Sequence, residues 1–447
     1  MKPYSSYAPF DAGWISSLPA HWSALQVKYV CTYNDEVLLD NTDANAQIEY
    51  VEISDVDEVN GLKGTESMAF KDAPSRARRL VRDGDIIIST VRTYLRAVAP
   101  IKNPPENLVV STGFAVVRPE GLLPGFARYA LVADGFVGSV IARSTGVSYP
   151  AINASDLVRI SVPVPPIDEQ RAIASYLDAE TARIDELIDE KQRLSDVLAE
   201  LRASVMGEAI QRGLRPDAKV VESGVPWLGD VPAHWRVLRL KHLLDGIEQG
   251  WSPQCDSRQA EDHEWGVLKA GACNGGVFHP EEQKALQAGM AADPSIEVKP
   301  GDVLMSRASG SLDLVGSVAH VDDVRPGLML SDKIFRLKID ESQGTSSKWL
   351  AMTFNTPAQR RQIASHVGGA EGLARNITSS AIMELWLAVP PPEEQMAIVE
   401  HVTGRVAHID ELTKAVGAEI ALLQELRSAT ITDAVLGRID VREHMKH

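Results

Sequence analysis

Two long stretches of the chain carry apolar residues at heptad spacing. In the first stretch, apolar residues fall every seven positions, and leucines follow three residues behind them. The second stretch repeats the pattern 225 residues later. Apolar residues at this spacing form one stripe along a helix, which is typical of coiled-coil helices. The predicted seam consists of Leu177, Ile184, Leu187, Lys191, Leu194, Leu198, Leu201, Val402, Ile409, Leu412, Val416, Glu419, Leu423 and Leu426.

Helix punctuation marks the ends of both stretches. Pro166 and Pro391 stand just before the stripes, and Gly213 and Gly437 lie near their ends. Proline favours a helix start and glycine a helix end, so two spacer helices are predicted over 166–213 and 391–437. About 40 residues at ~1.5 Å per residue give a helix about 60 Å long. Such a stripe needs a partner helix. Antiparallel pairing within the chain is favoured because globular segments separate the two helices, and pairing between chains is the alternative.

A charged residue interrupts each stripe near its middle. Lys191 takes an a position and Glu419 a d position. If a pseudo-two-fold axis relates the helices, the two side chains flank the same midpoint. We therefore expect them to form an ion pair that sets the register, since a buried ammonium group without a partner is costly. The alternative is that both side chains extend into solvent from a loose seam.

The segments between the predicted helices have a different pattern. Short apolar runs, such as those within 85–89 and 302–306, are broken by Gly, Pro and Asn. Such runs indicate strands joined by turns. The expected fold class is therefore α+β, with two tandem strand-rich domains at 1–165 and 214–390, joined by two long helices in an antiparallel coiled coil.

Short motifs also occur twice, in the same order. Pro-Ala-His-Trp stands at 19–22 and again at 232–235, and a proline pair followed by acidic residues and Gln stands at 165–170 and 390–395. A Gly-Asp pair precedes both strand runs. The chain is therefore a tandem duplication, and the long period excludes short-repeat solenoids. The repeated His-Trp pairs, fixed in turns beside apolar residues, are expected to pack and cap each module and not to act as bases.

The charge is distributed unevenly. The formal net charge is −16. Residues 168–200 hold ten acidic and four basic side chains, and 393–425 hold seven and two. The predicted helices thus carry most of the excess negative charge. Among the residues outside them, a basic cluster faces only Asp83 and Asp85 in the local sequence, and such a patch can meet a phosphate backbone despite an acidic total. Its members are Arg76, Arg78, Arg79, Arg82, Arg92 and Arg96.

The sequence contains none of the usual catalytic motifs. It has no phosphate-binding loop, nucleophile elbow or metalloprotease helix. Its cysteines, Cys31, Cys255 and Cys273, lack zinc-site spacing, and the expected compartment is the reducing cytoplasm. No leader-like segment or membrane-spanning window is found. The chain is expected to recognise a ligand and not to catalyse a reaction.

These motifs together resemble the specificity subunit of type I restriction-modification enzymes. The resemblance lies in residues 13–22, 84–92, 152–157 and 165–174, and the second half of the chain repeats most of them. It implies two target recognition domains, each reading one half of a split, asymmetric DNA sequence, with the coiled coil fixing the gap. It also implies double-stranded DNA, two modification subunits and restriction subunits as partners. The partners would use S-adenosylmethionine, ATP and Mg, with no cofactor or metal bound by this chain and no membrane.

The candidate DNA-binding side chains are donors near the ends of the two strand runs. In each domain, Arg contacts to guanine would specify sequence, whereas phosphate contacts would only position the domain. The solvated-surface alternative holds for each cation. The candidates are Arg76, Arg78, Arg79, Thr90, Arg92, Tyr94, Arg96, Arg143, Ser148, Tyr149, Ser306, Arg307, Ser309, Lys333, Arg360, Arg361 and Arg375.

Two other functions stay open at this point. The chain could be a stand-alone DNA methyltransferase or nuclease with an unrecognised active site, which an assay of the isolated chain would reveal. It could also be a protein-binding scaffold, in which case salt-dependent binding to duplex DNA would be absent.

Overall fold

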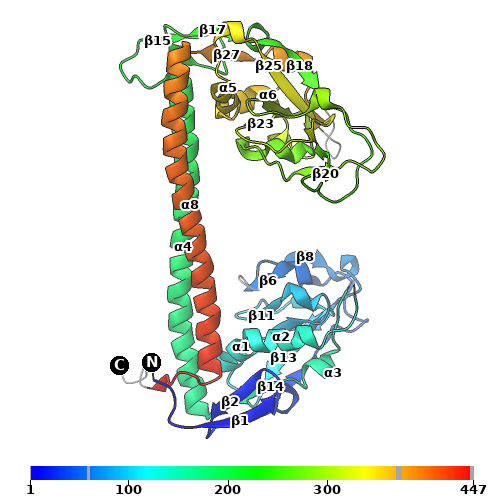
Figure 1. The fold of residues 1–447 in the computed structure, drawn as a ribbon. Coiled ribbons are helices and arrows are strands. Elements are labelled where there is room, and N and C mark those ends of the chain that lie inside the picture. Colours follow the sequence, from blue (N-terminus) through cyan, green and yellow to red (C-terminus); the bar gives the residue numbers. More distant parts are fainter. Residues whose placement is uncertain (1, 58–60, 148, 369–374, 443–447) are drawn as a thin grey trace. The chain divides into compact units, whose positions relative to one another are not determined.

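The computed structural model describes residues 2–57, 61–147, 149–368 and 375–442. The chain divides into two compact units. Unit 1 comprises 1–192 and 418–447, and unit 2 comprises 193–417. Each unit contains one strand-rich domain and part of each long helix, α4 (Ile167–Arg212) and α8 (Pro392–Val435) (Figure 1). The predicted mixture of strand-rich domains and two long helices is confirmed.

Unit 1 opens with an antiparallel strand pair and continues through two four-stranded sheets. The sheet orders are β11-β10-β13-β4 and β8-β5-β12-β9. The elements of its globular part are β1 (Tyr7–Ala12), β2 (Ile15–Pro19), β3 (Ser23–Gln26), β4 (Cys31–Tyr33), β5 (Gln47–Val51), β6 (Val56–Asp57), β7 (Gly61–Leu62), β8 (Glu66–Ala69), β9 (Ala77–Leu80), β10 (Ile86–Ser89), β11 (Val98–Pro100), β12 (Leu108–Ser111), β13 (Phe114–Pro119), α1 (Pro124–Val132), α2 (Asp134–Ala142), α3 (Ala154–Leu157) and β14 (Ser161–Val164).

Unit 2 repeats this order of pairing in its first sheet, and its second sheet has three strands where that of unit 1 has four. Its sheets run β18-β25-β21-β23 and β20-β19-β24, so β21 takes the place that β10 has in unit 1. Within each unit, one strand pair is parallel, β12 with β5 and β24 with β19. The elements are β15 (Val220–Glu222), β16 (Asp230–Pro232), β17 (Arg236–Arg239), β18 (Leu244–Gln249), β19 (Gly266–Leu268), β20 (Gln283–Ala285), β21 (Val303–Ser306), β22 (Ala308–Ser309), β23 (Val318–His320), β24 (Leu328–Met329), β25 (Ile334–Ile339), α5 (Ser347–Phe354), α6 (Pro357–Ala364), β26 (Arg375–Asn376), α7 (Ser379–Met383) and β27 (Trp386–Val389).

The central strand of each unit is buried on both faces. Successive side chains of a strand point to opposite faces. Ile86 and Ile88 of β10 accordingly pack in the cluster that contains α1 and α2, while Ile87 packs against the second sheet. In unit 2, Val303 and Met305 pack with α5 and α6, and Leu304 faces the other sheet. This explains why the two strand runs are continuously apolar and do not alternate. In Figure 1, α1 and α2 lie beside β11 and β13.

The two long helices run antiparallel within each unit. In unit 1, Arg427 forms an ion pair with Asp185 at 2.7 Å, and Lys191 pairs with Glu419. In unit 2, Arg202 pairs with Asp410 at 2.9 Å. Residue numbers rise along α4 as their partners' numbers fall along α8. The predicted ion pair between Lys191 and Glu419 is therefore confirmed, and its role in setting the register stays a prediction.

Burial along the helices distinguishes three classes of seam residue. The members of the series of seven that are buried are Leu177, Ile184, Leu198, Val402, Ile409 and Val416. Leu187 and Leu423 are half-buried. The four remaining leucines have exposed fractions between 42% and 47%, so they lie at the margin of the seam and not at its buried centre: Leu194, Leu201, Leu412 and Leu426.

The repeated motifs at the helix starts tie each helix to its own domain. In unit 1, the Gln170 amide donates to Pro165 O at 2.9 Å and accepts from Leu123 N at 2.8 Å. In unit 2, Gln395 makes the equivalent bonds to Pro390 and Ser346, at 2.9 and 2.8 Å. The repeated glutamine therefore links the start of each long helix to the residue that precedes α1 in unit 1 or α5 in unit 2.

The repeated histidines bind the glutamates of the same motifs. His21 Nε2 lies 2.7 Å from Glu169 Oε1, and the same carboxylate accepts from Tyr4 and Trp22. His234 Nε2 lies 2.7 Å from Glu394 Oε2 in unit 2. These contacts are those of the packing and capping role predicted for the His-Trp pairs.

Within the described part of the chain, no single helix is long and apolar enough to cross a membrane. The bent pair α1 and α2 passes that test together by length and composition, and Phe126, Leu131 and Phe136 of this pair are fully buried in the core of unit 1.

Candidate nucleic-acid interface

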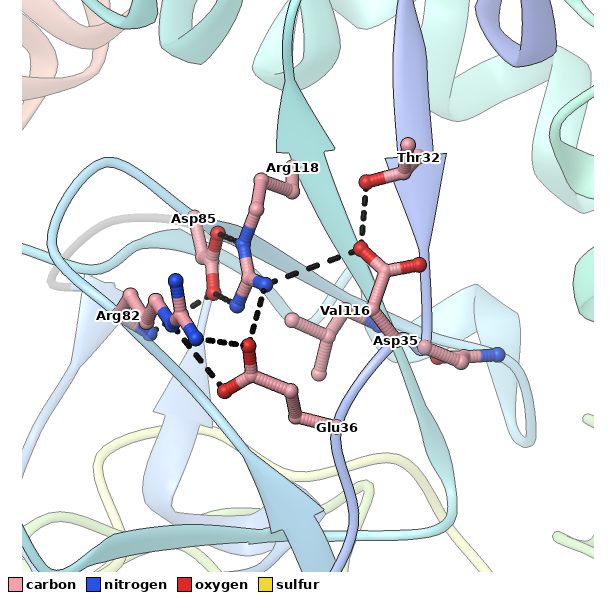
Figure 2. A network of polar contacts seen from close by, with 8 residues as sticks. Thr32, Asp35, Glu36, Arg82, Asp85, Val116 and Arg118 are labelled. Carbon is pink, nitrogen blue, oxygen red and sulfur yellow. Dashed lines mark hydrogen bonds and ion pairs between the residues drawn. The ribbon is translucent and has the colours of Figure 1, made fainter.

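A buried ion-pair network fixes the start of β10, whose other end carries the first candidate loop. The Asp85 carboxylate is 1% exposed and accepts two bonds from Arg118, from Nε at 2.8 Å and Nη2 at 2.7 Å (Figure 2). Arg118 also reaches Glu36, which pairs with Arg82. A buried carboxylate is tolerated when its charge is paired and hydrogen-bonded in this way. These bonds to Asp85 raise the pKa of Arg118.

Unit 2 contains the same network. Arg336 pairs with Asp302 at 3.0 Å and with Glu248 at 2.7 Å. Burial raises the pKa of Asp302 above its ordinary value. The repeated Gly-Asp pair of the sequence is therefore more than a turn signal, because its aspartate holds an arginine of the neighbouring strand in each unit. The signal that the sequence offered was the aspartate's repetition, but its partner lies 33 residues further along the chain in unit 1.

The loop after β10 has an unusual backbone conformation. Arg92 has φ 50° and Arg96 has φ 52°, both in the left-handed region. Residues other than glycine seldom adopt this region, and such strain is often found at functional sites. Between them, Tyr94 is 52% exposed. Thr90 at the loop's start uses its hydroxyl to donate to Gly113 O at 2.8 Å, so this hydroxyl already has an acceptor.

A second loop, described over 143–147 and 149–151, packs against the first. Val91 pairs with Ala151 in an isolated bridge, and Thr93 Oγ1 lies 2.7 Å from Ser144 Oγ. The Arg92 guanidinium lies 4.9 Å from the centre of the Tyr149 ring, which is 66% exposed. The fold thus brings together arginine and tyrosine side chains that the sequence separates by more than 50 residues.

Several candidate arginines are neutralised by carboxylates from elsewhere in unit 1. Arg78 pairs with Asp40 at 3.6 Å and lies over Phe70, and Arg96 pairs with Asp134. Arg82 pairs with Glu36. The local sequence gives this basic cluster only Asp83 and Asp85 as acidic neighbours, and folding adds acidic residues that are distant in sequence.

The remaining candidates of unit 1 differ in availability. Within the described residues, Arg76, Arg92 and Arg143 are exposed and have no carboxylate partner. Arg79 is half-buried, and its burial lowers the pKa of its guanidinium. Ser148 lies outside the described residues.

In unit 2, Arg307 occupies the backbone position that Thr90 has in unit 1. Ile152 N donates to Thr90 O at 2.9 Å, and Ile377 N donates to Arg307 O at 3.0 Å. The preceding residue, Ser306, is 1% exposed. Arg307 Nη1 donates to Asp332 O at 3.3 Å. The two strand ends therefore present different side chains at one equivalent position.

The other candidates of unit 2 differ in their surroundings. Ser309 and Arg375 are opposite each other in the pair β22 and β26. Arg360 is held by backbone, since Nη2 donates to Asp313 O at 2.8 Å and Val315 O at 2.7 Å, and burial lowers its pKa. Arg361 is exposed, and Lys333 pairs with Asp332 at 3.1 Å.

Sequence reasoning missed a groove in unit 2 that lies beside Lys333. It has a volume of about 420 Å³ and is lined by segments 252–255, 267–270 and 331–333 together with Lys284. Lys269 is a further lining cation. These lysines come from three separate segments and share no motif, so only the fold assembles them. Among the described residues, no group of three or more His, Cys, Asp or Glu side chains could hold a metal ion.

Comparison with known proteins shows which proteins this chain is similar to. Residues 21–194 match the family model described as "Type I restriction modification DNA specificity domain". The chain is 23% identical over 328 residues to the type I restriction enzyme EcoKI specificity subunit of Escherichia coli strain K12, covering 72% of this chain and 68% of that protein. It is 27% identical over 208 residues to the EcoEI specificity subunit of Escherichia coli, covering 46% of this chain and 34% of that protein.

A solved structure has the same fold. It is described as "Structural basis underlying complex assembly and conformational transition of the type I R-M system". It superimposes with a TM-score of 0.73 at 23% identity and covers 96% of this chain and 100% of the other. The relatives are specificity subunits, which agrees with the prediction that this chain is a non-catalytic one.

Proposed function

We propose that the chain is a DNA specificity subunit of a type I restriction-modification system, in which each strand-rich domain reads one half of a split, asymmetric duplex sequence. The domains at 1–165 and 214–390 are the target recognition domains of this proposal. The helices α4 and α8 set the number of unread base pairs between the half-sites.

One observation carries the proposal of two reading sites. The strand ends at Thr90 and Arg307 are bonded in the same way to Ile152 and Ile377, yet they present different side chains. Two sites of equal construction and unequal chemistry suit a target whose halves differ in sequence. In unit 1 the unpaired arginines and exposed tyrosines are the candidates for contact, because guanidinium groups bind both phosphates and guanine edges.

The subunit acts with partners. A specificity subunit belongs to a larger restriction-modification system. We propose that two modification subunits bind this chain and use S-adenosylmethionine to methylate adenine. Restriction subunits that depend on ATP and Mg would join the same complex. This chain itself would bind no cofactor, and the complex would act in the cytoplasm.

A comparison of methylation with and without the chain tests the proposal. We expect a host that expresses the chain with its modification subunits to carry N6-methyladenine at one bipartite motif, and a host lacking only this chain to lose methylation at that motif. The isolated chain, given S-adenosylmethionine or Mg-ATP, should neither methylate nor cleave DNA. Activity of the isolated chain would instead establish the stand-alone enzyme considered above.

A further inference from the structure

The lysine-lined groove of unit 2 combines positive charge with a single carboxylate. Lys269, Lys284 and Lys333 line it, and Asp332 is the acidic lining residue. Lys269 is 3.5 Å from Glu282, whereas exposed Lys284 has no carboxylate partner among the residues described. Ammonium groups around a groove attract a polyanion such as the DNA backbone.

The groove adjoins the strand end that corresponds to the candidate loop of unit 1. Arg307 N donates to Lys333 O at 2.7 Å, and in unit 1 Thr90 N donates to Gly113 O at 2.8 Å in the same way. The segment that carries Asp332 therefore lies on the face of unit 2 that the duplication equates with the Thr90 loop. This relation makes DNA the occupant that the repeat favours.

The Asp332 carboxylate is fixed in place. Ser252 donates its hydroxyl to Asp332 Oδ1, and Asp332 N donates back to Ser252 Oγ at 3.2 Å. Lys333 Nζ lies 3.1 Å from the other carboxylate oxygen. The Ser252 bond and then the Lys333 ammonium lower the pKa of Asp332. The side chain is 36% exposed, so one edge of an ionised acceptor stays open to a ligand.

An ionised carboxylate on a DNA-facing surface has restricted uses. Phosphates repel it, and guanine and thymine present acceptor oxygens in the major groove. Cytosine N4 and adenine N6 are amino donors there, and Asp or Glu accepts from cytosine N4. A fixed Asp332 flanked by ammonium groups can therefore favour a base that offers an amino hydrogen.

We propose that this groove binds the half-site read by unit 2, with Asp332 selecting a cytosine or adenine by its exocyclic amino group and Lys284 contacting a phosphate. The inference rests on the proposed function and assigns a specificity-determining residue within it. Neither residue was a sequence candidate, since only Lys333 of this groove was named from its sequence.

The test uses the chain in complex with its modification subunits and duplexes that carry its methylated motif. We expect Asp332→Asn to reduce discrimination at one base position of one half-site by about tenfold or more, with the other positions unchanged. Asp323→Asn is the matched control, because Asp323 is an exposed carboxylate of the same unit outside the groove. A uniform loss of affinity for all sequences, or an unchanged motif, overturns the role of Asp332.

A change in the DNA makes the test independent of how the variant folds. The adenine or cytosine at that position is replaced by purine or pyrimidin-2-one, which lack only the amino group. The wild-type complex should bind the duplex without the amino group about tenfold more weakly than the normal duplex. The Asp332→Asn complex should bind both duplexes with the same affinity. Equal binding of both duplexes by the wild type excludes the amino contact.

The phosphate contact has its own measurement. Lys284→Ala should reduce the slope of log affinity against log salt concentration by about 0.9, the value for one phosphate contact. Lys299→Ala is the control, because Lys299 is exposed and lies outside the groove, and it should leave the slope unchanged. An unchanged slope for Lys284→Ala overturns this contact. If the wild-type complex shows no sequence preference at all, the proposed function fails instead.

Discussion

At the scale of single residues, the availability of an arginine depends on which carboxylates the fold brings to it. Arg78 and Arg92 both belong to the basic cluster of the sequence. The first is held by Asp40 and the ring of Phe70, whereas the second lies over exposed Tyr149. A carboxylate partner occupies donors of a guanidinium and offsets its charge, which weakens its attraction to DNA. The two arginines therefore have different prospects as DNA contacts.

This difference gives a prediction for unit 1. Arg92→Ala should cost ~1–3 kcal/mol of binding free energy at one base position and relax specificity there, because its guanidinium has no carboxylate to release. Arg78→Ala, the matched control, should leave the preference at every position as it is. Binding selections over randomised half-sites measure both effects. If Arg92→Ala weakens all sequences alike, Arg92 contacts a phosphate and reads no base.

The sequence located the two candidate loops but not the state of their side chains. The strand ends at Ser89 and Ser306 could be located because an apolar run stops there. The pairing of Arg82 with Glu36, 46 residues away, could not be inferred, since no local pattern records which loops meet. The groove with Asp332 and Lys284 escaped for the same reason.

At the scale of elements, the helix pair was predictable because its signal is periodic. The heptad stripes located both helices, and the repeat offset located Lys191 opposite Glu419. The same offset relates Arg202 to Arg427 and Asp185 to Asp410, and these four residues form two equivalent ion pairs, one in each unit. A comparison of the copies for charged residues would have found them. Burial could not be read from periodicity alone, as the exposed leucines at the seam margin show.

A double-mutant cycle tests the ion pair in the middle of the helices. Lys191→Leu and Glu419→Leu should each change the unfolding free energy, and the double variant should deviate from their sum by about 0.2–1 kcal/mol. Exposed pairs are worth this little because solvent screens them, and the two side chains are 33% and 52% exposed. Thermal unfolding measures the terms. Additive effects would show that the pair does not contribute to the register.

At the scale of the whole molecule, the duplication organises the fold. Each unit has the same strand order in its first sheet, an ion pair between arginine and aspartate at the start of the central strand, and a glutamine at a helix start. Selection on a duplicated chain can preserve these structural contacts while the loops diverge. The tandem architecture was therefore predictable from repeated motifs, whereas the loop chemistry that differs between copies could be obtained only from the folded units.

The proposed role of the helices leads to a prediction about spacing. Insertion of one heptad into both α4 and α8, between 192 and 193 and between 417 and 418, preserves the apolar stripe and adds about 10.5 Å of helix. At about 3.4 Å per base pair, the methylated motif should gain about three base pairs in its gap. These base pairs also turn the second half-site by about 100° around the duplex, so methylation should be slower than in the wild type. Mapping of N6-methyladenine in the host measures the gap.

As a control, a four-residue insertion in α4 alone breaks the stripe and should lower the unfolding temperature. A heptad variant that folds and still methylates the original motif would show that the helices do not set the gap.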